Sequence, residues 1–465
     1  MQAKLTQGSV GIHLVQLTLP MIWGVFAVIA FSLADTYFVA QLGTQALAAM
    51  SFTFPVVMGL GSVAMGLGTG AASVIARALG EGNRYRVQRL TTDSLILSLI
   101  LVGILVVLGQ VTIDPLFKAL GAGPEVMPLV RAYMEIWYPG MICLVIPMVG
   151  NSAIRALGNT LAPSVIMTVA AVANIGLDPL FIFGWGNIPG MGVRGAAIAT
   201  VLSRAITLIA ALALLHYQEQ MLLFTRPRWQ TLIQNGRQIF HVGLPAAATN
   251  LIPPLSVGLI TNLVASYGAA AVAGLGIASR IEAFAFIVPM SVAASMGPFV
   301  GQNWGAQQVG RIQQSLRLTS LFCWGWGVLL AIALGANATS VAALFDPDQI
   351  VVKTAATYLF WVPISYGAVG GILILSTTFN ALGKPFPSMV MIALRTLILY
   401  IPCAYLGSQW FGIQGIFGAA CLTNFVVGCG AFLWAWRSGC LGGRTSRSPS
   451  LAPPDPTEET VAVNS

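Results

Sequence analysis

Twelve apolar segments of about twenty residues or more run along the chain, and short polar loops separate them. A helix of roughly twenty residues crosses the ~30 Å hydrocarbon core of a bilayer. Only 8% of the residues are charged and 57% are hydrophobic, which excludes a soluble protein. We therefore predict an all-α integral membrane protein of twelve transmembrane helices. These cover about residues 12–40, 50–78, 91–113, 127–153, 161–184, 193–216, 238–266, 275–301, 313–336, 350–380, 387–407 and 413–436.

Lysine and arginine residues gather in alternate loops, after the even-numbered spans. They include Arg77, Arg84, Arg86, Arg89, Arg155, Arg226, Arg228, Arg237, Arg311, Arg317, Lys384, Arg437, Arg444 and Arg447. Cytoplasmic loops of membrane proteins carry this excess of positive charge. Both termini are therefore predicted to lie in the cytoplasm, and the protein in the cell's inner (plasma) membrane. The net charge of +8 comes from these loops and does not indicate nucleic-acid binding.

The sequence also repeats itself. Pro20 recurs as Pro245, Gly43 as Gly268, Gly80 as Gly305, Arg86 as Arg311 and Gly158 as Gly383, always after the same interval of 225 residues. Each half then holds six spans, so both insert in the same direction and their pseudo-twofold axis runs along the membrane normal. We predict a first lobe of residues 1–216, a cytoplasmic linker of residues 217–237, a second lobe of residues 238–436 and a disordered cytoplasmic tail of residues 437–465.

Carboxylates inside the apolar segments are the candidate functional groups. Asp35 lies near the outer end of the first span, and Asp178 near that of the fifth. Asn174 shares a helix face with Asp178, four residues away. A charged side chain costs roughly 2.5–3.5 kcal/mol in hydrocarbon, so such residues usually line a polar cavity or an ion path. The alternatives are that Asp35 reaches headgroup water and that Asp178 with Pro179 only ends a helix.

Two carboxylates in a low-dielectric cavity raise each other's proton affinity, which suits a proton carrier. Thr200 in the sixth span is predicted to line the same cavity. Arg204 is either a partner for the acids or an interhelical contact. Na⁺ could use the same oxygen atoms, with Asn174 as a neutral ligand. Pro20 lacks a backbone N–H, so the first span can bend there, and it is the predicted hinge.

The second half lacks these acids. Ile260 and Cys403 stand at the repeat positions of Asp35 and Asp178. The charges that remain inside its spans are Arg280, Glu282 and Arg395. Arg280 and Glu282 are predicted to hold neighbouring helices together. The ion switch is therefore expected in the first half.

Enzymatic chemistry is not indicated by any motif. The three histidines lie near span ends, and the six cysteines have no CxxC or metal-ligand spacing. The sequence holds no nucleophile motif, no metal-ligand cluster and no Walker-type phosphate loop. We predict that the protein is not an enzyme, holds no metal or cofactor, and is not driven by ATP.

Several sequence segments resemble those of the multidrug and toxic compound extrusion (MATE) family, and within it the DinF-like branch. The resemblance rests on ADTYFVAQLGTQALAA, ALGEGN, ANIGLDPLFIFG, SRIEAFAF and GQNWGAQ, which fall in order along residues 10–436. It implies twelve helices in two lobes and the cation-coupled export of amphipathic, often cationic drugs. The coupling acids of the family then correspond to Asp35 and Asp178, with Asn174 beside them and Thr200 as a looser match. NorM-like members add acids in spans 7 and 10, which this chain lacks, and this favours protons over Na⁺.

Other transport functions stay open at this point. A lipid or lipid-linked precursor flippase of related fold and a Na⁺-coupled exporter are the main alternatives. A major-facilitator transporter shares the repeat but not the loop ALGEGNRYRVQRL, and a channel would need symmetric rings of polar residues. The expected partners are small-molecule drugs or organic cations, protons and the lipid bilayer, with no nucleic acid and with the protein as a monomer.

Overall fold

The computed structural model describes residues 3–186, 188–225 and 228–437. Its helical elements are η1 (Lys4–Thr6), α1 (Val10–Ala40), α2 (Thr44–Gly80), α3 (Arg84–Ala119), α4 (Met127–Ala156), α5 (Leu161–Ile182), α6 (Val193–Ala213), η2 (Leu214–Gln218), α7 (Trp229–Ala265), α8 (Ala269–Ala285), α9 (Ile287–Gly305), α10 (Val309–Ala336), α11 (Ala338–Ala343), α12 (Gln349–Trp361), η3 (Val362–Ser365), α13 (Tyr366–Ala381), α14 (Pro385–Ala393), η4 (Leu394–Tyr400), α15 (Ile401–Phe411) and α16 (Ile413–Arg437). The strands β1 (Gly184–Trp185) and β2 (Ile188–Pro189) pair antiparallel. The predicted tail lies outside the described residues except for Arg437, as do the loop arginines Arg226, Arg444 and Arg447.

Twelve spans are present, as predicted, but one of them is broken. Eleven helical segments of the described chain are long and apolar enough to cross a membrane, and α8 with α9, bent by 45°, is the twelfth. The span predicted over 275–301 therefore consists of two helices that meet at a bend. Pro289 has no N–H for the carbonyl of Ala285, four residues earlier. That carbonyl instead accepts the indole N–H of Trp326 at 3.2 Å, so it keeps a partner where the helix breaks.

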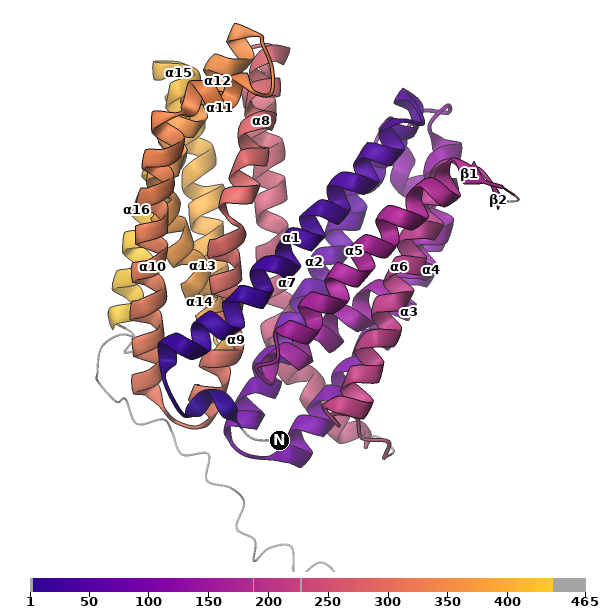
Figure 1. Cartoon of the computed structure of the whole chain (residues 1–465), viewed down its shortest axis with the longest axis vertical. Coiled ribbons are helices and arrows are strands. Elements are labelled where there is room, and N and C mark those ends of the chain that lie inside the picture. Colours follow the sequence, from indigo (N-terminus) through magenta and orange to yellow (C-terminus); the bar gives the residue numbers. More distant parts are fainter. Residues whose placement is uncertain (1–2, 187, 226–227, 438–465) are drawn as a thin grey trace, which may run out of the picture.

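The helices form two bundles, which Figure 1 shows side by side. The first bundle contains α1–α6 and the second contains α7–α16. The bundles meet at the end of the molecule where α1 begins, which we call the closed end. They diverge toward the end where α1 finishes, which we call the open end (Figure 1).

The contact between α2 and α9 at the closed end is reciprocal. A Cβ atom on Gly80 would lie 2.1 Å from the carbonyl oxygen of Gln302, and one on Gly305 would lie 2.1 Å from the carbonyl oxygen of Arg77. The 225-residue repeat separates Gly305 from Gly80 and also Gln302 from Arg77. Two identical subunits meeting on a twofold axis would show this exchange of partners. The two halves are therefore related by a pseudo-twofold axis that passes between α2 and α9.

A second pair of contacts obeys the same symmetry. Gly70 on α2 packs against the backbone of Gly243 on α7, where a Cβ would come within 3.0 Å of the Gly243 nitrogen. In the counterpart, the hydroxyl groups of Thr18 on α1 and Ser295 on α9 hydrogen-bond at 3.0 Å. Thr18 corresponds to Gly243 in the repeat, and Gly70 to Ser295. Each half therefore supplies its first helix to the other half at the closed end.

Helices α1 and α7 cross from one bundle to the other, as Figure 1 shows for α1. Leu14 and Leu17, early in α1, pack with Met296 and Phe299 of the second bundle. Val39, at the other end of α1, packs in the core of the first bundle. Helix α7 crosses in the opposite sense, because Ile239 packs with the first bundle and Val264 packs with the second. The repeat prolines Pro20 and Pro245 lie between the two packed parts of these crossing helices.

The bundles separate along the face by which α2 contacts α7. Gly66 on α2 lies so close to Gly243 that a Cβ would come within 2.4 Å of its carbonyl oxygen. Gly59 lies two helical turns further toward the open end, on the same face of α2. A Cβ there would meet nothing within 4 Å. The contact between the bundles therefore ends between these two glycines.

Part of the predicted linker is helical. Helix α7 begins at Trp229, so residues 229–237 belong to it rather than to a loop. Leu232 and Gly236, four residues apart, are buried on one face of these first turns. A Cβ on Gly236 would touch Leu97 of α3, so packing against α3 extends the helix beyond its membrane-spanning part.

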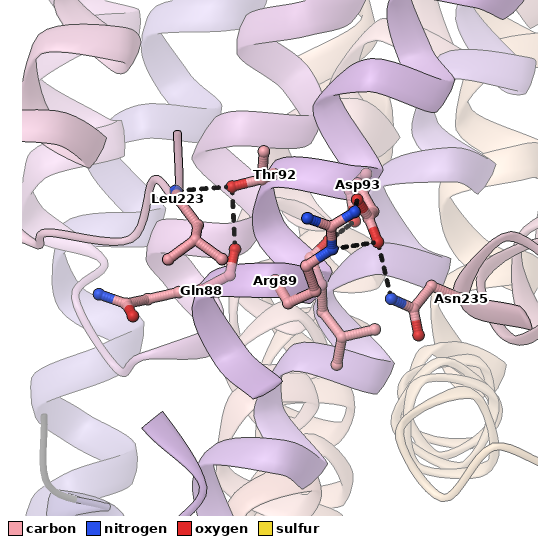
Figure 2. Close-up of polar contacts among 8 residues, drawn as sticks. Gln88, Arg89, Thr92, Asp93, Leu223 and Asn235 are labelled. Carbon is pink, nitrogen blue, oxygen red and sulfur yellow. Dashed lines mark hydrogen bonds and ion pairs between the residues drawn. The ribbon is translucent and has the colours of Figure 1, made fainter. Parts of the chain in front are cut away.

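A buried polar network fastens the chain between the bundles to α3 (Figure 2). Arg89 Nε donates to Asp93 at 3.1 Å, and Asn235 Nδ2 of α7 donates to the same carboxylate at 2.8 Å. The backbone N–H of Leu223, in the linker, donates to the hydroxyl of Thr92 at 2.9 Å. The Arg89 and Asp93 side chains are only 6% and 0% exposed. The linker and the start of α7 are thus held by α3 of the first bundle.

We expect Asp93→Ala to destabilise the protein by about 3–5 kcal/mol, because it leaves the guanidinium of Arg89 buried without its carboxylate. Thermal unfolding of the purified protein in detergent measures this loss. Asp114→Ala is the control, because it removes an exposed carboxylate that pairs with Arg131 and should change the unfolding temperature little. Equal unfolding temperatures for the two variants would contradict the prediction.

Candidate functional site

Close helix packing positions the predicted site residues in the first bundle. A Cβ on Gly24 of α1 would come within 2.9 Å of the Ser164 hydroxyl of α5. A Cβ on Gly195 of α6 would lie 2.1 Å from the carbonyl oxygen of Phe181, at the end of α5. Helices that approach this closely leave little room between their facing side chains. The polar residues of α1, α5 and α6 are therefore brought together between these helices.

Asn174 and Asp178 form the buried centre of the site. Both side chains are 0% exposed, and Asn174 Nδ2 donates to Asp178 Oδ1 at 3.1 Å. Their spacing of four residues along α5 allows this bond within one helix face. Pro179 follows inside the same helix and has no N–H for the backbone ladder. The helix continues to Ile182, so Asp178 and Pro179 do not end it, which was one of the alternatives.

Asp35 faces this pair from α1. Its Oδ1 atom is buried and has no hydrogen-bond partner among the described residues. Asp35 lies near enough to Asp178 and to Arg204 for their charges to interact. The Arg204 guanidinium carbon lies 4.7 Å from the centre of the Phe31 ring, one helical turn before Asp35. The ion pairs of the described residues do not include Arg204, so it approaches Asp35 without closing a salt bridge.

Thr200 on α6 is the fourth predicted residue, and it forms no hydrogen bond to either carboxylate. Its Oγ1 atom is buried without a partner. The other three predicted residues also have buried oxygen atoms without a protein partner, namely Asp35 Oδ1, Asn174 Oδ1 and Asp178 Oδ2. An unsatisfied buried polar group costs about 1–3 kcal/mol, so four on the adjoining helices α1, α5 and α6 favour a site that takes up protons, water or a cation.

Tyr133 lies beside the site, although no pattern in the sequence indicates this. It lies on α4, is 4% exposed, and interacts electrostatically with Asp35, Asp178 and Arg204. Its sequence context, YMEIWYPG, is that of an aromatic core helix. Only the packing of α4 against α6 brings it near the acids. A phenol there can donate a hydrogen bond to a carboxylate or accept one from a protonated acid.

The second bundle has a polar cluster of a different kind. The Tyr358 hydroxyl of α12 donates to Glu282 of α8 at 2.5 Å, and Arg395 Nε donates to Asn424 of α16 at 2.8 Å. Both bonds join neighbouring helices, as predicted for Glu282. Arg280 is exposed, and no hydrogen bond or ion pair of it is found among the described residues, so its predicted role as an interhelical contact was wrong. It lies two residues from Glu282 and therefore on another face of α8.

Comparison with known proteins identifies relatives over most of the chain. The MatE family profile matches residues 20–180 and 245–406. These two matches begin at the repeat prolines, Pro20 and Pro245. The FAD transporter of Shewanella oneidensis is 38% identical and aligns with 93% of this chain and 96% of its own length. The multidrug export protein MepA of Staphylococcus aureus is 25% identical and aligns with 90% of this chain and 91% of its own.

Solved structures agree with these matches. The Vibrio cholerae MATE transporter VcmN in its bent form superposes with a TM-score of 0.87 at 33% identity, over 93% of this chain and 97% of VcmN. A multidrug resistance MATE transporter of the MOP superfamily in an outward-facing conformation also gives a TM-score of 0.87, at 26% identity, over 94% of this chain and 97% of its own. The two-bundle architecture is therefore shared with transporters of known structure.

Proposed function

Because this chain belongs to the MatE family of multipass membrane transporters, we propose that it is a multidrug antiporter that exports amphipathic, often cationic compounds in exchange for protons. As a member of this family it is a transporter and not an enzyme. The observation that carries the proton coupling is the set of buried, unpartnered oxygen atoms on Asp35, Asn174, Asp178 and Thr200. We propose Asp35 and Asp178 as the proton-coupling residues, and Asn174 and Thr200 as further lining of the cavity.

Protonation would change the force between the two acids. Two carboxylates repel each other, whereas a protonated acid can share a hydrogen bond with its neighbour. Asp35 would then move toward Asp178 and draw the outer part of α1 with it. The inner part of α1 is packed in the second bundle, so the helix has to bend between the two, and Pro20 is the proposed hinge. Loading and release of protons would thus bias the two conformations of alternating access.

The proposal also includes the orientation of the chain in the membrane. The positive loops favour cytoplasmic termini and an inner-membrane location, which would place the open end outside the cell. Both bundles lie in one chain, so a monomer suffices for transport. In this orientation the structure corresponds to an outward-facing state. Protons from outside would then reach Asp35 and Asp178 from the open end.

A second candidate substrate class is favoured by one comparison. The relative named FAD transporter is 38% identical to this chain, whereas the relatives named as multidrug proteins are 24–26% identical. We therefore propose a flavin dinucleotide as the alternative cargo of the same transporter. A lipid-linked precursor would be a third cargo, for a flippase of related fold.

We expect a pH gradient to drive export in proteoliposomes without Na⁺, and an imposed Na⁺ gradient at constant pH to drive none. The purified protein would be reconstituted with either a fluorescent organic cation or FAD as cargo, so that the same vesicles test both substrate classes. Vesicles without protein give the background. Export driven by Na⁺ alone would contradict proton coupling, and transport of FAD alone would replace the multidrug proposal by the dinucleotide one.

A further inference from the structure

A basic pocket lies at the closed end, between the two bundles. It has a volume of about 810 Å³, and its lining includes Arg77, Glu81, Arg86, Arg237, His241 and Gly383. Arg77 comes from α2, Glu81 from the turn after α2, and Arg86 from α3. Arg237 and His241 come from α7, and Gly383 from the turn after α13. Both bundles therefore contribute to its wall.

The positive charge of the basic pocket is only partly balanced. Glu81 forms an ion pair with Arg86, with 2.6 Å between Oε2 and Nη1. Within the described residues, neither Arg77 nor Arg237 has a carboxylate partner within ion-pair distance. Arg77 Nε donates to the carbonyl of Ser73 at 3.2 Å, which fixes the base of its guanidinium group. Two guanidinium groups thus remain available in the pocket.

The positions related to the basic pocket by the 225-residue repeat form a second site. There the segment around η1 fills the corresponding space. Arg311 is the repeat counterpart of Arg86, and it donates to the carbonyl oxygens of Gly8 at 2.7 Å and Leu5 at 2.9 Å. Gly158 is the counterpart of Gly383, and a Cβ there would touch the side chain of Leu5 at 3.2 Å. Gln302 is the counterpart of Arg77, and its Oε1 accepts the N–H of Leu5 at 3.3 Å. The segment around η1 therefore supplies oxygen acceptors to that copy.

In the described part of the chain, no such segment enters the basic pocket. Residues 229–231 are the repeat counterparts of η1, and they form the first turn of α7. Their carbonyl oxygens are directed along the helix instead of into the pocket. Among the described residues, the arginine-rich copy of this site therefore has no acceptors from a segment equivalent to η1, and the carboxylate in its lining, Glu81, is paired with Arg86.

We propose that the basic pocket binds a phosphate- or diphosphate-bearing anion. Guanidinium groups bind phosphate oxygens by paired, charge-assisted hydrogen bonds, and two of them are available here. Such an anion could be the headgroup of an acidic lipid or a soluble phosphate ester, and the chemistry of recognition is the same. Because the pocket has walls from both bundles, the bound anion stabilises the conformation in which they meet at the closed end.

The test is thermal unfolding of the purified full-length protein with two probes. One probe is inorganic pyrophosphate in detergent, compared with sodium chloride at equal ionic strength. The other is phosphatidylglycerol in phosphatidylcholine nanodiscs, compared with phosphatidylcholine alone. We expect at least one probe to raise the unfolding temperature by about 3 °C or more. Arg77→Gln and Arg237→Gln should each weaken that probe's effect, with about tenfold lower affinity.

Arg228→Gln is the matched control, because Arg228 is exposed at the start of α7 and does not line the pocket. Stabilisation by pyrophosphate alone assigns the pocket to soluble phosphates, and stabilisation by the anionic lipid alone assigns it to a headgroup. Arg237 is itself exposed, so its glutamine variant should fold. The proposal is overturned if neither probe stabilises the wild type, or if Arg237→Gln responds as the wild type does. No transport is measured, so this result is independent of the coupling ion.

Discussion

Export is expected to fall to the level of vesicles without protein when Asp35 is replaced by asparagine. Asparagine keeps the size and shape of the side chain, but it can neither gain nor lose a proton. Asp35 Oδ1 has no partner within the part of the chain that the structure describes, so the substitution breaks no hydrogen bond there. Removal of a charge from a membrane span also lowers the cost of inserting it. The variant should therefore reach the membrane folded and inactive, as measured by membrane yield and gradient-driven efflux.

Asp178→Asn should have the same effect on efflux, because the two acids are proposed to act as one unit. The control is Asp114→Asn, which neutralises an exposed carboxylate of α3 that pairs with Arg131 outside the site. It should leave efflux unchanged. If Asp35→Asn still exports drug at the wild-type rate under a pH gradient, proton coupling resides elsewhere in the molecule.

A second large loss of export is expected when alanine replaces Gly80 or Gly305. The added Cβ would lie 2.1 Å from a backbone carbonyl oxygen of the facing helix, where no side chain can move aside. Helices α2 and α9 would have to separate, and overpacking of this kind costs about 1–3 kcal/mol. The conformation in which the closed end is sealed would be destabilised. A cost of ~1.4 kcal/mol lowers its population about tenfold, so export should fall at least about tenfold.

The two glycine variants should behave alike, because their contacts are reciprocal. Gly103→Ala and Gly276→Ala are the controls, since a Cβ at either position would meet nothing within 4 Å. Alanine favours helix over glycine, so these variants should be as stable as the wild type or slightly more so. Thermal unfolding and efflux, measured together, separate the two pairs. Wild-type behaviour of Gly80→Ala would show that α2 and α9 do not need this approach.

The membrane spans and the repeat could be predicted because both are one-dimensional patterns. Length and hydropathy identify a span without its neighbours, and the interval from Pro20 to Pro245 is visible in the sequence. The break at Phe286, three residues before Pro289, was missed because prolines also occur inside unbroken helices of this chain, such as Pro55 in α2. Tolerance of a proline depends on which partner the freed carbonyl finds. For Ala285 that partner is Trp326, which lies on another helix.

In the candidate site, too, spacing along the sequence could be predicted, whereas contacts between helices could not. Asn174 and Asp178 could be paired from sequence because a spacing of four residues places them on one helix face. The position of Asp35 followed from counting its depth in the membrane. Tyr133 could not be found in this way, because its approach to the acids depends on how α4 packs against α6. Nor does hydropathy show which bundle holds each half of α1.

The exchange of α1 and α7 between the bundles has a consequence for synthesis of the protein. Leu14 packs with Met296, which leaves the ribosome roughly 280 residues later, or roughly 15–60 s at a translation rate of ~5–20 residues per second. During that interval the early part of α1 has no native partner, and lipid or a chaperone has to cover it. Contacts this distant in sequence also slow folding. The first six helices therefore cannot complete their native packing until α9 has entered the membrane.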